Sequence, residues 1–194
     1  NEADWVGKWT TTAEAVFYPR PAQYLCRSFN VKPGLAEARI YQTAHGIYES
    51  FINGAATDAD KFKPGLTSYY YRIQYQTYDI TSLVKEGENS WNVTLVDGWW
   101  RGSTGGSVIN NWGRSLDYLG QIELTYADGT TEIIGTDEVF QMATGPLLAS
   151  DMLMGDIYDA RLECTNWQPV ELLRGDPVLS GLTAKRIASR SVPV

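Results

Sequence analysis

One stretch of the chain collects side chains that could bind a sugar. The segment Leu95–Ser115, LVDGWWRGSTGGSVINNWGRS, sets three tryptophans among glycines, amides and guanidinium groups. The C–H face of a pyranose packs well on an aromatic ring, and its hydroxyl pairs suit planar amides and guanidinium groups. The candidate sugar-binding residues are Trp99, Trp100, Arg101, Asn110, Asn111, Trp112 and Arg114.

The same segment also allows a purely structural interpretation. If the alternation of the preceding strand continues, Trp99 faces the core and Trp100 points away from it. The N-terminal segment would then cover Trp100, and the pair Asn110–Asn111 would only form turns. A bulge at Gly98 would exchange the two tryptophans.

Acidic residues near the end of the chain are the candidates for acid–base chemistry. The motif GDIYDARLE contains Asp156, Asp159 and Glu163, and glycoside cleavage uses a pair of carboxylates. The nearby Arg161 favours a structural role instead, in which Asp159 pairs with Arg161 or with turn amides. We therefore assign no catalytic residue.

The metal-binding residue types are sparse, and we assign no metal ligand. His45 is the only histidine, so a Ser–His–Asp triad could be built only around it. The segment around Asp58 and Asp60 lacks the length and the glycine of a calcium loop, so we predict a solvated loop there. Cys26 and Cys164 fit no metal spacing; they allow one long-range disulfide or two buried thiols, and a core of this size favours the thiols.

The bulk composition indicates one ordered domain and excludes two partner classes. The chain has 194 residues, 43% of them hydrophobic, and a formal net charge of −7. A negative chain without a basic cluster repels nucleic acid. Its apolar runs fall well short of the ~20 residues that span a bilayer.

Alternation of apolar and polar residues dominates the elements that must position these side chains. The segments that predict strands are QYLCRSFNV, EARIYQTA, IYESFING, YYYRIQYQTYDI, SWNVTLVDGW and the hairpin QIELTYADGTTEII. Short strands separated by Gly and Asn turns predict an all-β fold, an antiparallel jelly-roll sandwich.

Two of these strands carry more specific expectations. Alternation in the tyrosine-rich strand predicts an inner face made of Tyr69, Tyr71, Ile73, Tyr75 and Thr77. In the hairpin, Asp128-Gly129 supplies the turn and Ile133 starts the return strand.

DITSLVKEGEN predicts the one short helical turn. Asp79 or Thr81 can cap it, Leu83 and Val84 can be buried, and Gly87 can end it in the left-handed conformation.

We divide the chain into a lead-in segment at 1–22, a β-sandwich domain at 23–174 and a connector at 175–194 that leads to a following domain. The lead-in carries three aromatic side chains that we expect to pack over the sandwich: Trp5, Trp9 and Phe17.

Four motifs together resemble the N-terminal domain of bacterial α-L-rhamnosidases, glycoside hydrolase family 78. They are AHGIYESFING, KPGLTSYYYRIQYQTYDITSLVKEGEN, LVDGWWRG and GDIYDARLE. The resemblance extends from about Tyr24 to Trp167.

The resemblance implies a noncatalytic sandwich that precedes a helical-barrel catalytic domain in the same chain. Related sandwiches include carbohydrate-binding modules that hold L-rhamnose with a calcium ion, so calcium is a possible cofactor. Four residues depart from the family pattern and count against transferring a calcium site directly: His45, Ser68, Trp100 and Asp156.

Three functions follow from these expectations. The first is assistance in recognising rhamnose-containing glycans, and the second is a purely structural role that buttresses the barrel. The third, hydrolysis by this domain alone, is disfavoured by its fold and length. A secreted or periplasmic location is favoured over a cytoplasmic one.

Overall fold

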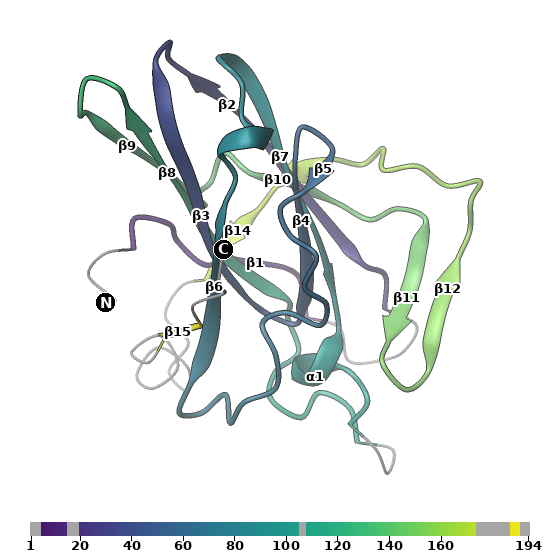
Figure 1. Cartoon of the computed structure of the whole chain (residues 1–194). Helices are drawn as coiled ribbons and strands as arrows, with labels where there is room; N and C mark the ends of the chain where they lie inside the picture. The colour runs from purple at the N-terminus through teal and green to yellow at the C-terminus, as the bar shows by residue number, and fades with distance from the viewer. Residues whose placement is uncertain (1–4, 15–19, 105–107, 174–186, 191–194) are drawn as a thin grey trace.

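The computed structural model is a β-sandwich, which confirms the predicted all-β fold. It describes residues 5–14, 20–104, 108–173 and, for the backbone only, 187–190. Two large sheets face each other, and a separate two-stranded hairpin projects beside them (Figure 1). No helix in these ranges is long and apolar enough to cross a membrane.

The first sheet has seven strands, in the order β14-β1-β8-β3-β6-β15, with β9 also paired to β8. Its strands are β1 (Thr10–Thr11), β3 (Leu35–His45), β6 (Ile73–Asp79), β8 (Asp117–Tyr126), β9 (Thr131–Gly135), β14 (Glu171–Leu172) and β15 (Ile187–Arg190).

The second sheet has six strands, in the order β13-β10-β2-β7-β4-β5. Its strands are β2 (Gln23–Val31), β4 (Ile47–Ile52), β5 (Ala55–Ala56), β7 (Gly87–Val96), β10 (Gln141–Ala143) and β13 (Gln168–Pro169). The hairpin consists of β11 (Leu147–Asp151) and β12 (Gly155–Tyr158).

The core lies between the two sheets and follows from strand alternation. In β7 the side chains of Trp91, Val93 and Leu95 are buried, as predicted. They meet buried residues of β8 such as Ile122 and Leu124 within one continuous apolar cluster.

The predicted inner face of the tyrosine-rich strand is only partly right: Tyr69 and Ile73 are buried as expected, but in a second apolar cluster with Trp100, separate from the main core. Tyr69 and Tyr71 precede β6 in a turn, where Tyr71 is exposed, and the core-facing residues of β6 are Gln76 and Tyr78. Gln76 can be buried because both polar atoms of its side chain have a hydrogen-bond partner. Its Oε1 accepts the Tyr48 hydroxyl proton at 2.7 Å, and its Nε2 donates to the Pro64 carbonyl at 3.3 Å.

The predicted turns are formed with small differences. Gly129 has φ +83° in the β8–β9 hairpin, but the return strand starts at Thr131 rather than Ile133. The helical turn is a 3₁₀ helix at Thr81–Leu83, preceded by Asp79, whose Oδ1 accepts the Thr81 amide proton at 2.9 Å. Gly87 has φ +82° as predicted, but it begins β7 instead of ending the helix.

The two ends of the chain contribute strands to the first sheet. β1, from the lead-in segment, lies between β8 and β14, and Trp5 packs edge-on against Tyr75. Phe17 lies outside the described residues. In the expected connector, the described residues 187–190 pair in parallel with β6 as β15.

Candidate functional site

The tryptophan pair is turned by one residue relative to our prediction. Gly98 has φ +53°, and a Cβ added there would lie 2.6 Å from the Ile47 side chain. This close approach requires glycine, and the chain leaves β7 to form the short helix α1 (Gly98–Arg101). Trp100 is therefore the buried member and Trp99 is only half-buried, so the predicted orientation of the pair is wrong.

Trp100 is held in a three-ring stack. The His45 imidazole lies between Trp9 and Trp100, with ring centroids 4.4 and 3.9 Å away and planes within 7° and 11° of parallel. His45 Nδ1 is 2.7 Å from Asp117 Oδ2, and both side chains are buried. The only histidine thus joins the lead-in segment to α1, and the side chain that its Nδ1 contacts is the carboxylate of Asp117.

Arg101 belongs to a buried ion network. Its Nε and Nη2 each lie 2.7 Å from Asp97 Oδ1, and Arg20 Nη2 lies 2.6 Å from Asp97 Oδ2. Burial raises the pKa of Asp97, although Arg101 and Arg20 oppose this shift. A buried, paired guanidinium is not accessible to a ligand, so Arg101 contributes to the fold and not to a binding surface.

The remaining candidates lie on the loop between α1 and β8. Asn110 has φ +56° and accepts a hydrogen bond from Arg20 at 2.5 Å, whereas Asn111 and Arg114 are exposed. Trp112 is half-buried, and its ring lies 5.5 Å from Tyr69 and 4.9 Å from Tyr70. The structure therefore does not bring the seven predicted residues to one surface.

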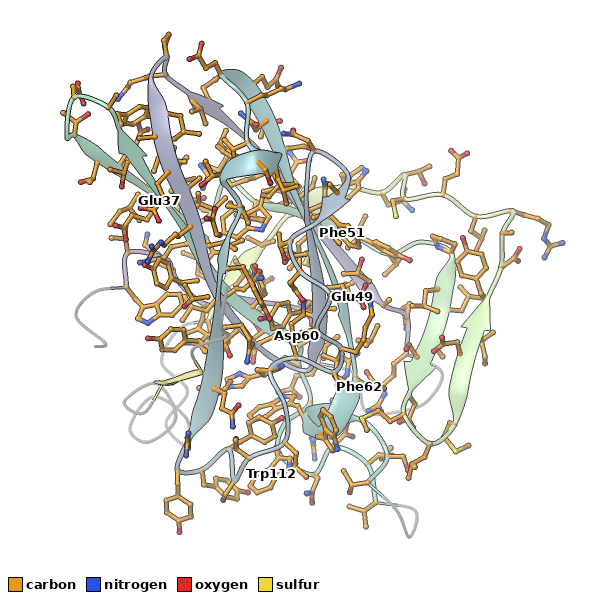
Figure 2. The ribbon with its side chains drawn as sticks, in the orientation of Figure 1. Glu37, Glu49, Phe51, Asp60, Phe62 and Trp112 are labelled. Atoms are coloured by element: carbon orange, nitrogen blue, oxygen red, sulfur yellow. The ribbon has the colours of Figure 1, made fainter. Side chains whose placement is uncertain are left out.

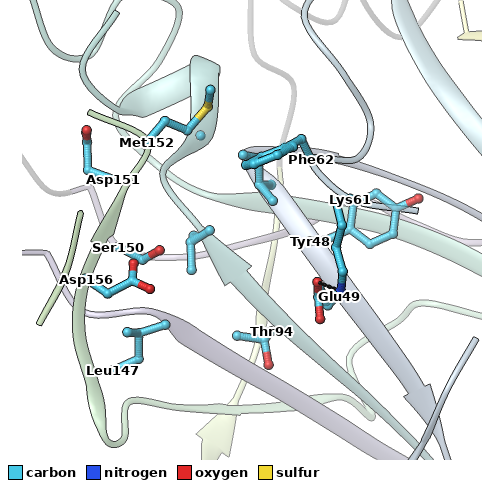
Figure 3. Close-up of a pocket in the computed structure, with 13 residues that line it drawn as sticks. Tyr48, Glu49, Lys61, Phe62, Thr94, Leu147, Ser150, Asp151, Met152 and Asp156 are labelled. Atoms are coloured by element: carbon cyan, nitrogen blue, oxygen red, sulfur yellow. Dashed lines mark hydrogen bonds and ion pairs between the residues drawn. The ribbon is translucent and has the colours of Figure 1, made fainter. Parts of the chain in front are cut away.

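A pocket of about 420 Å³ lies over the outer face of β4 and β7, next to Gly98 at the start of α1 (Figure 3). Glu49, Lys61 and Phe62 line one side of it, and residues of the β11–β12 hairpin line the opposite side. The hairpin residues are Leu147, Ser150, Asp151, Met152 and Asp156. This volume falls in the usual range of small-molecule sites, roughly 300–1,000 Å³.

The pocket combines an aromatic wall with charged groups. Phe62 is exposed, and its ring packs edge-on against Trp99 at 6.0 Å. Lys61 Nζ lies 2.6 Å from Glu49 Oε1, and this hydrogen bond raises the pKa of Lys61. Trp99 is thus the candidate that the structure places beside the pocket, whereas Trp112 lies at the lower end of the molecule in Figure 2.

Sequence reasoning missed Glu49, Lys61 and Phe62. Glu49 could have been found, because alternation in IYESFING turns it away from the core. Phe62 could not, because its outward position depends on a left-handed backbone (φ +57°) that a bulky residue rarely adopts.

The acidic candidates are largely paired. Arg161 Nε and Nη2 contact Asp159 Oδ1 and Oδ2 at 2.8 and 2.7 Å, which confirms the predicted pairing. The predicted solvated loop at Asp58 is wrong: its carboxylate is buried and ion-paired with buried Lys63, which also lies over the Tyr48 ring. Asp60 accepts the Tyr78 hydroxyl proton at 2.9 Å.

These pairings do not fit a calcium site. Among the described residues, no group of three or more His, Cys, Asp or Glu side chains could hold a metal ion. Cys26 and Cys164 are free, half-buried thiols, as favoured above. Burial raises the pKa of both, and Cys164 raises that of Cys26 further.

The family model for the α-L-rhamnosidase N-terminal domain matches residues 34–176, about three quarters of the chain. The chain belongs to this family. The resemblance drawn from the four motifs is thereby confirmed. An α-L-rhamnosidase of Formosa agariphila is 36% identical over an alignment 179 residues long, which covers 86% of this chain and 19% of that protein.

Solved structures of α-L-rhamnosidases contain the same sandwich. The Streptomyces avermitilis enzyme, in complex with L-rhamnose, matches with a TM-score of 0.75 and 36% identity, over 78% of this chain and 16% of that one. The native Aspergillus terreus enzyme matches with a TM-score of 0.82 and 29% identity, over 90% of this chain and 22% of that one. This α-L-rhamnosidase N-terminal domain spans between 13% and 19% of the length of the curated relatives it matches.

Proposed function

We propose that this chain is a noncatalytic domain of an α-L-rhamnosidase and that it assists recognition of L-rhamnose-containing glycans. The observation that carries the proposal is the pocket over β4 and β7, in which an exposed aromatic ring faces charged and hydroxyl groups across an open space. Carbohydrate sites require this combination, because a sugar has both C–H faces and hydroxyl groups.

The pocket suits a 6-deoxy sugar in particular. The carboxylates of Glu49 and Asp156 can accept protons from sugar hydroxyls, and the Lys61 ammonium can donate to ring or hydroxyl oxygens. The Phe62 ring and the Met152 side chain provide apolar surface for the C–H face and the methyl group that replaces the sixth hydroxyl.

The second candidate function is a purely structural domain without a ligand of its own. It is favoured by the burial of Trp100 and Arg101, because these two candidates stabilise the fold and do not face solvent. The two functions predict different results when sugar is added.

The deciding experiment is calorimetric titration of this chain with L-rhamnose, with and without calcium. We expect saturable binding that Phe62→Ala weakens about five- to tenfold, by the ~1 kcal/mol of an aromatic contact. Calcium should make no difference, since the described acidic residues do not fit a site for it.

Tyr71→Ala is the matched control, because Tyr71 is exposed to the same extent (59%, against 57% for Phe62) and does not line the pocket. An equal loss of L-rhamnose affinity in the two variants would show that the sugar does not bind in the pocket. Absence of any binding heat would favour the structural role.

A further inference from the structure

The β11–β12 hairpin forms its own two-stranded sheet beside the sandwich, and the Ala22 amide, which donates to the Leu147 carbonyl at 2.9 Å, attaches its β11 side to the domain. We call residues Leu147–Tyr158 the hairpin arm; it projects beside the domain in Figure 1. Its two strands pair only with each other among the described strands, and all four residues of β12 are exposed. Ala149 and Asp151 of β11 are buried, so the hairpin is packed along one strand, whereas its fully exposed second strand is open to further packing.

The arm exposes several apolar side chains, whereas a segment that faced only water would expose mainly polar ones. Exposed fractions reach 61% for Leu153, 68% for Met154, 47% for Ile157 and 64% for Tyr158. Leu162 and Trp167, which follow the arm, are also exposed. Contiguous exposed apolar side chains mark interaction surfaces on soluble proteins.

The arm holds these side chains in a defined position. The buried Asp151 accepts the amide protons of Leu153 and Met154 through Oδ1, at 2.8 and 3.0 Å. Its Oδ2 accepts the Ser103 amide proton at 2.5 Å, which ties the arm to the loop after α1. The apolar tip is therefore presented by a braced turn, and a partner would bind it without having to order a loose loop.

The arm also exposes an unpaired strand edge. β12 pairs with β11 along one side, and no described strand pairs with its other side. Native proteins cover or blunt such edges, because free N–H and C=O groups can pair with another chain. The one charged residue of β12, Asp156, lines the pocket, and the strand contains no lysine or proline that would blunt its edge.

We propose that the hairpin arm is the docking surface for another domain of the same rhamnosidase chain. The chain spans at most 19% of the length of the curated relatives it matches, so such an enzyme contains several times more protein to cover the arm. Interfaces between domains of one chain bury about 600–1,500 Å², which an arm with several large apolar side chains can supply. The inference rests on the proposed function only in placing this domain within a rhamnosidase, and it does not depend on sugar binding.

Docking on the arm is compatible with the pocket. In the β11–β12 register Ser150 lies opposite Asp156, and both line the pocket. Ile157, the next residue, lies opposite Ala149 and points to the other face of the hairpin. A domain bound to Ile157 and to the tip residues Leu153 and Met154 would leave Ser150 and Asp156 in place, whereas Tyr158 shares the face of Asp156 and lies on the pocket side of the strand.

Hydrogen–deuterium exchange of the full rhamnosidase and of this 194-residue chain tests the proposal. We expect the amides of residues 153–158 to exchange at least about tenfold more slowly in the full enzyme than in the isolated chain. The double variant Met154→Lys/Ile157→Lys should lose this protection in the full enzyme. Val139→Lys is the control, because the exposed fraction of Val139 (58%) lies between those of Met154 and Ile157 and because it lies away from the arm, between β9 and β10.

Equal exchange in the two proteins would overturn the proposal. So would protection in the isolated chain accompanied by a dimeric mass in light scattering, since a second copy would then cover the arm. Sugar titration of the arm variant separates the two proposals: unchanged rhamnose binding with lost protection supports docking, and absent rhamnose binding with normal protection contradicts only glycan recognition.

Discussion

Trp100 connects three segments that are far apart in the sequence. Its ring stacks on His45 from β3, which in turn stacks on Trp9 from the lead-in segment, and its indole N–H donates to the Ser115 carbonyl at 3.0 Å. Trp100→Ala should therefore lower the free energy of unfolding by about 3–5 kcal/mol, the cost of truncating a buried aromatic ring. Urea denaturation monitored by circular dichroism measures this change.

Trp99→Ala is the comparison for that variant. Trp99 is half-buried and contacts Phe62 at the rim of the pocket, so its removal should cost much less stability and should weaken L-rhamnose binding. A larger loss of stability for Trp99→Ala than for Trp100→Ala would contradict the arrangement described here.

The two cysteines give a second test at the level of single side chains. Burial raises the pKa of Cys26 and of Cys164, so less thiolate than usual is present at neutral pH. Alkylation by iodoacetamide at pH 7 should be slower in the folded chain than for a free cysteine, and should accelerate as the pH rises above the ordinary thiol pKa. In denaturant two thiols should react; finding none would show a disulfide.

Among the connecting elements, the turn before β7 depends on the conformation of one glycine. Gly87 has φ +82°, and a Cβ added there would meet no atom within 4 Å. Gly87→Ala should thus cost only the conformational penalty, about 1 kcal/mol in the free energy of unfolding.

Gly46→Ala provides the contrast, because it adds a steric clash to the same kind of penalty. Gly46 has φ +130°, and an added Cβ would lie 2.6 Å from the Val96 carbonyl oxygen. Its denaturation midpoint should fall clearly below that of Gly87→Ala. Equal midpoints would show that the packing at the β3–β4 junction can relax.

Elements could be predicted from the sequence where alternation alone decides burial. β7 follows this rule, and Trp91, Val93 and Leu95 are buried as expected. β6 does not, because Gln76 is buried through hydrogen bonds to Tyr48 and Pro64 that no local pattern reveals. At Gly98 the left-handed backbone shifts the tryptophan pair by one residue, which explains why the most specific part of the site prediction failed.

For the molecule as a whole, we predict that the domain has no catalytic activity. Asp159 is paired with Arg161, and the pocket carboxylates come from segments whose proposed role is binding. An aryl α-L-rhamnoside incubated with a high concentration of the chain should release no measurable phenol. Turnover that is lost in Asp156→Asn or Asp159→Asn would contradict this prediction.

The family could be identified from the sequence, whereas the pocket could not. Four motifs resembled α-L-rhamnosidases because they contain many consecutive residues of the family pattern. The pocket instead combines β4 and the nearby Lys61 and Phe62 with the hairpin arm, which lies far from them in the sequence. Such a site arises only when the folded sheets bring these segments together.

The position of β1 determines when this domain can finish folding during synthesis on a ribosome. Thr10 lies opposite Tyr118 of β8 on one side and opposite Leu172 of β14 on the other, so a strand near the start of the chain pairs with one near its end. Pairing between residues so distant is slow and must wait until β14 has been made. A nascent chain that stops before Glu171 would leave one edge of β1 unpaired and prone to aggregate. This sandwich can therefore close only after synthesis has continued far enough beyond residue 172 for β14 to leave the ribosome.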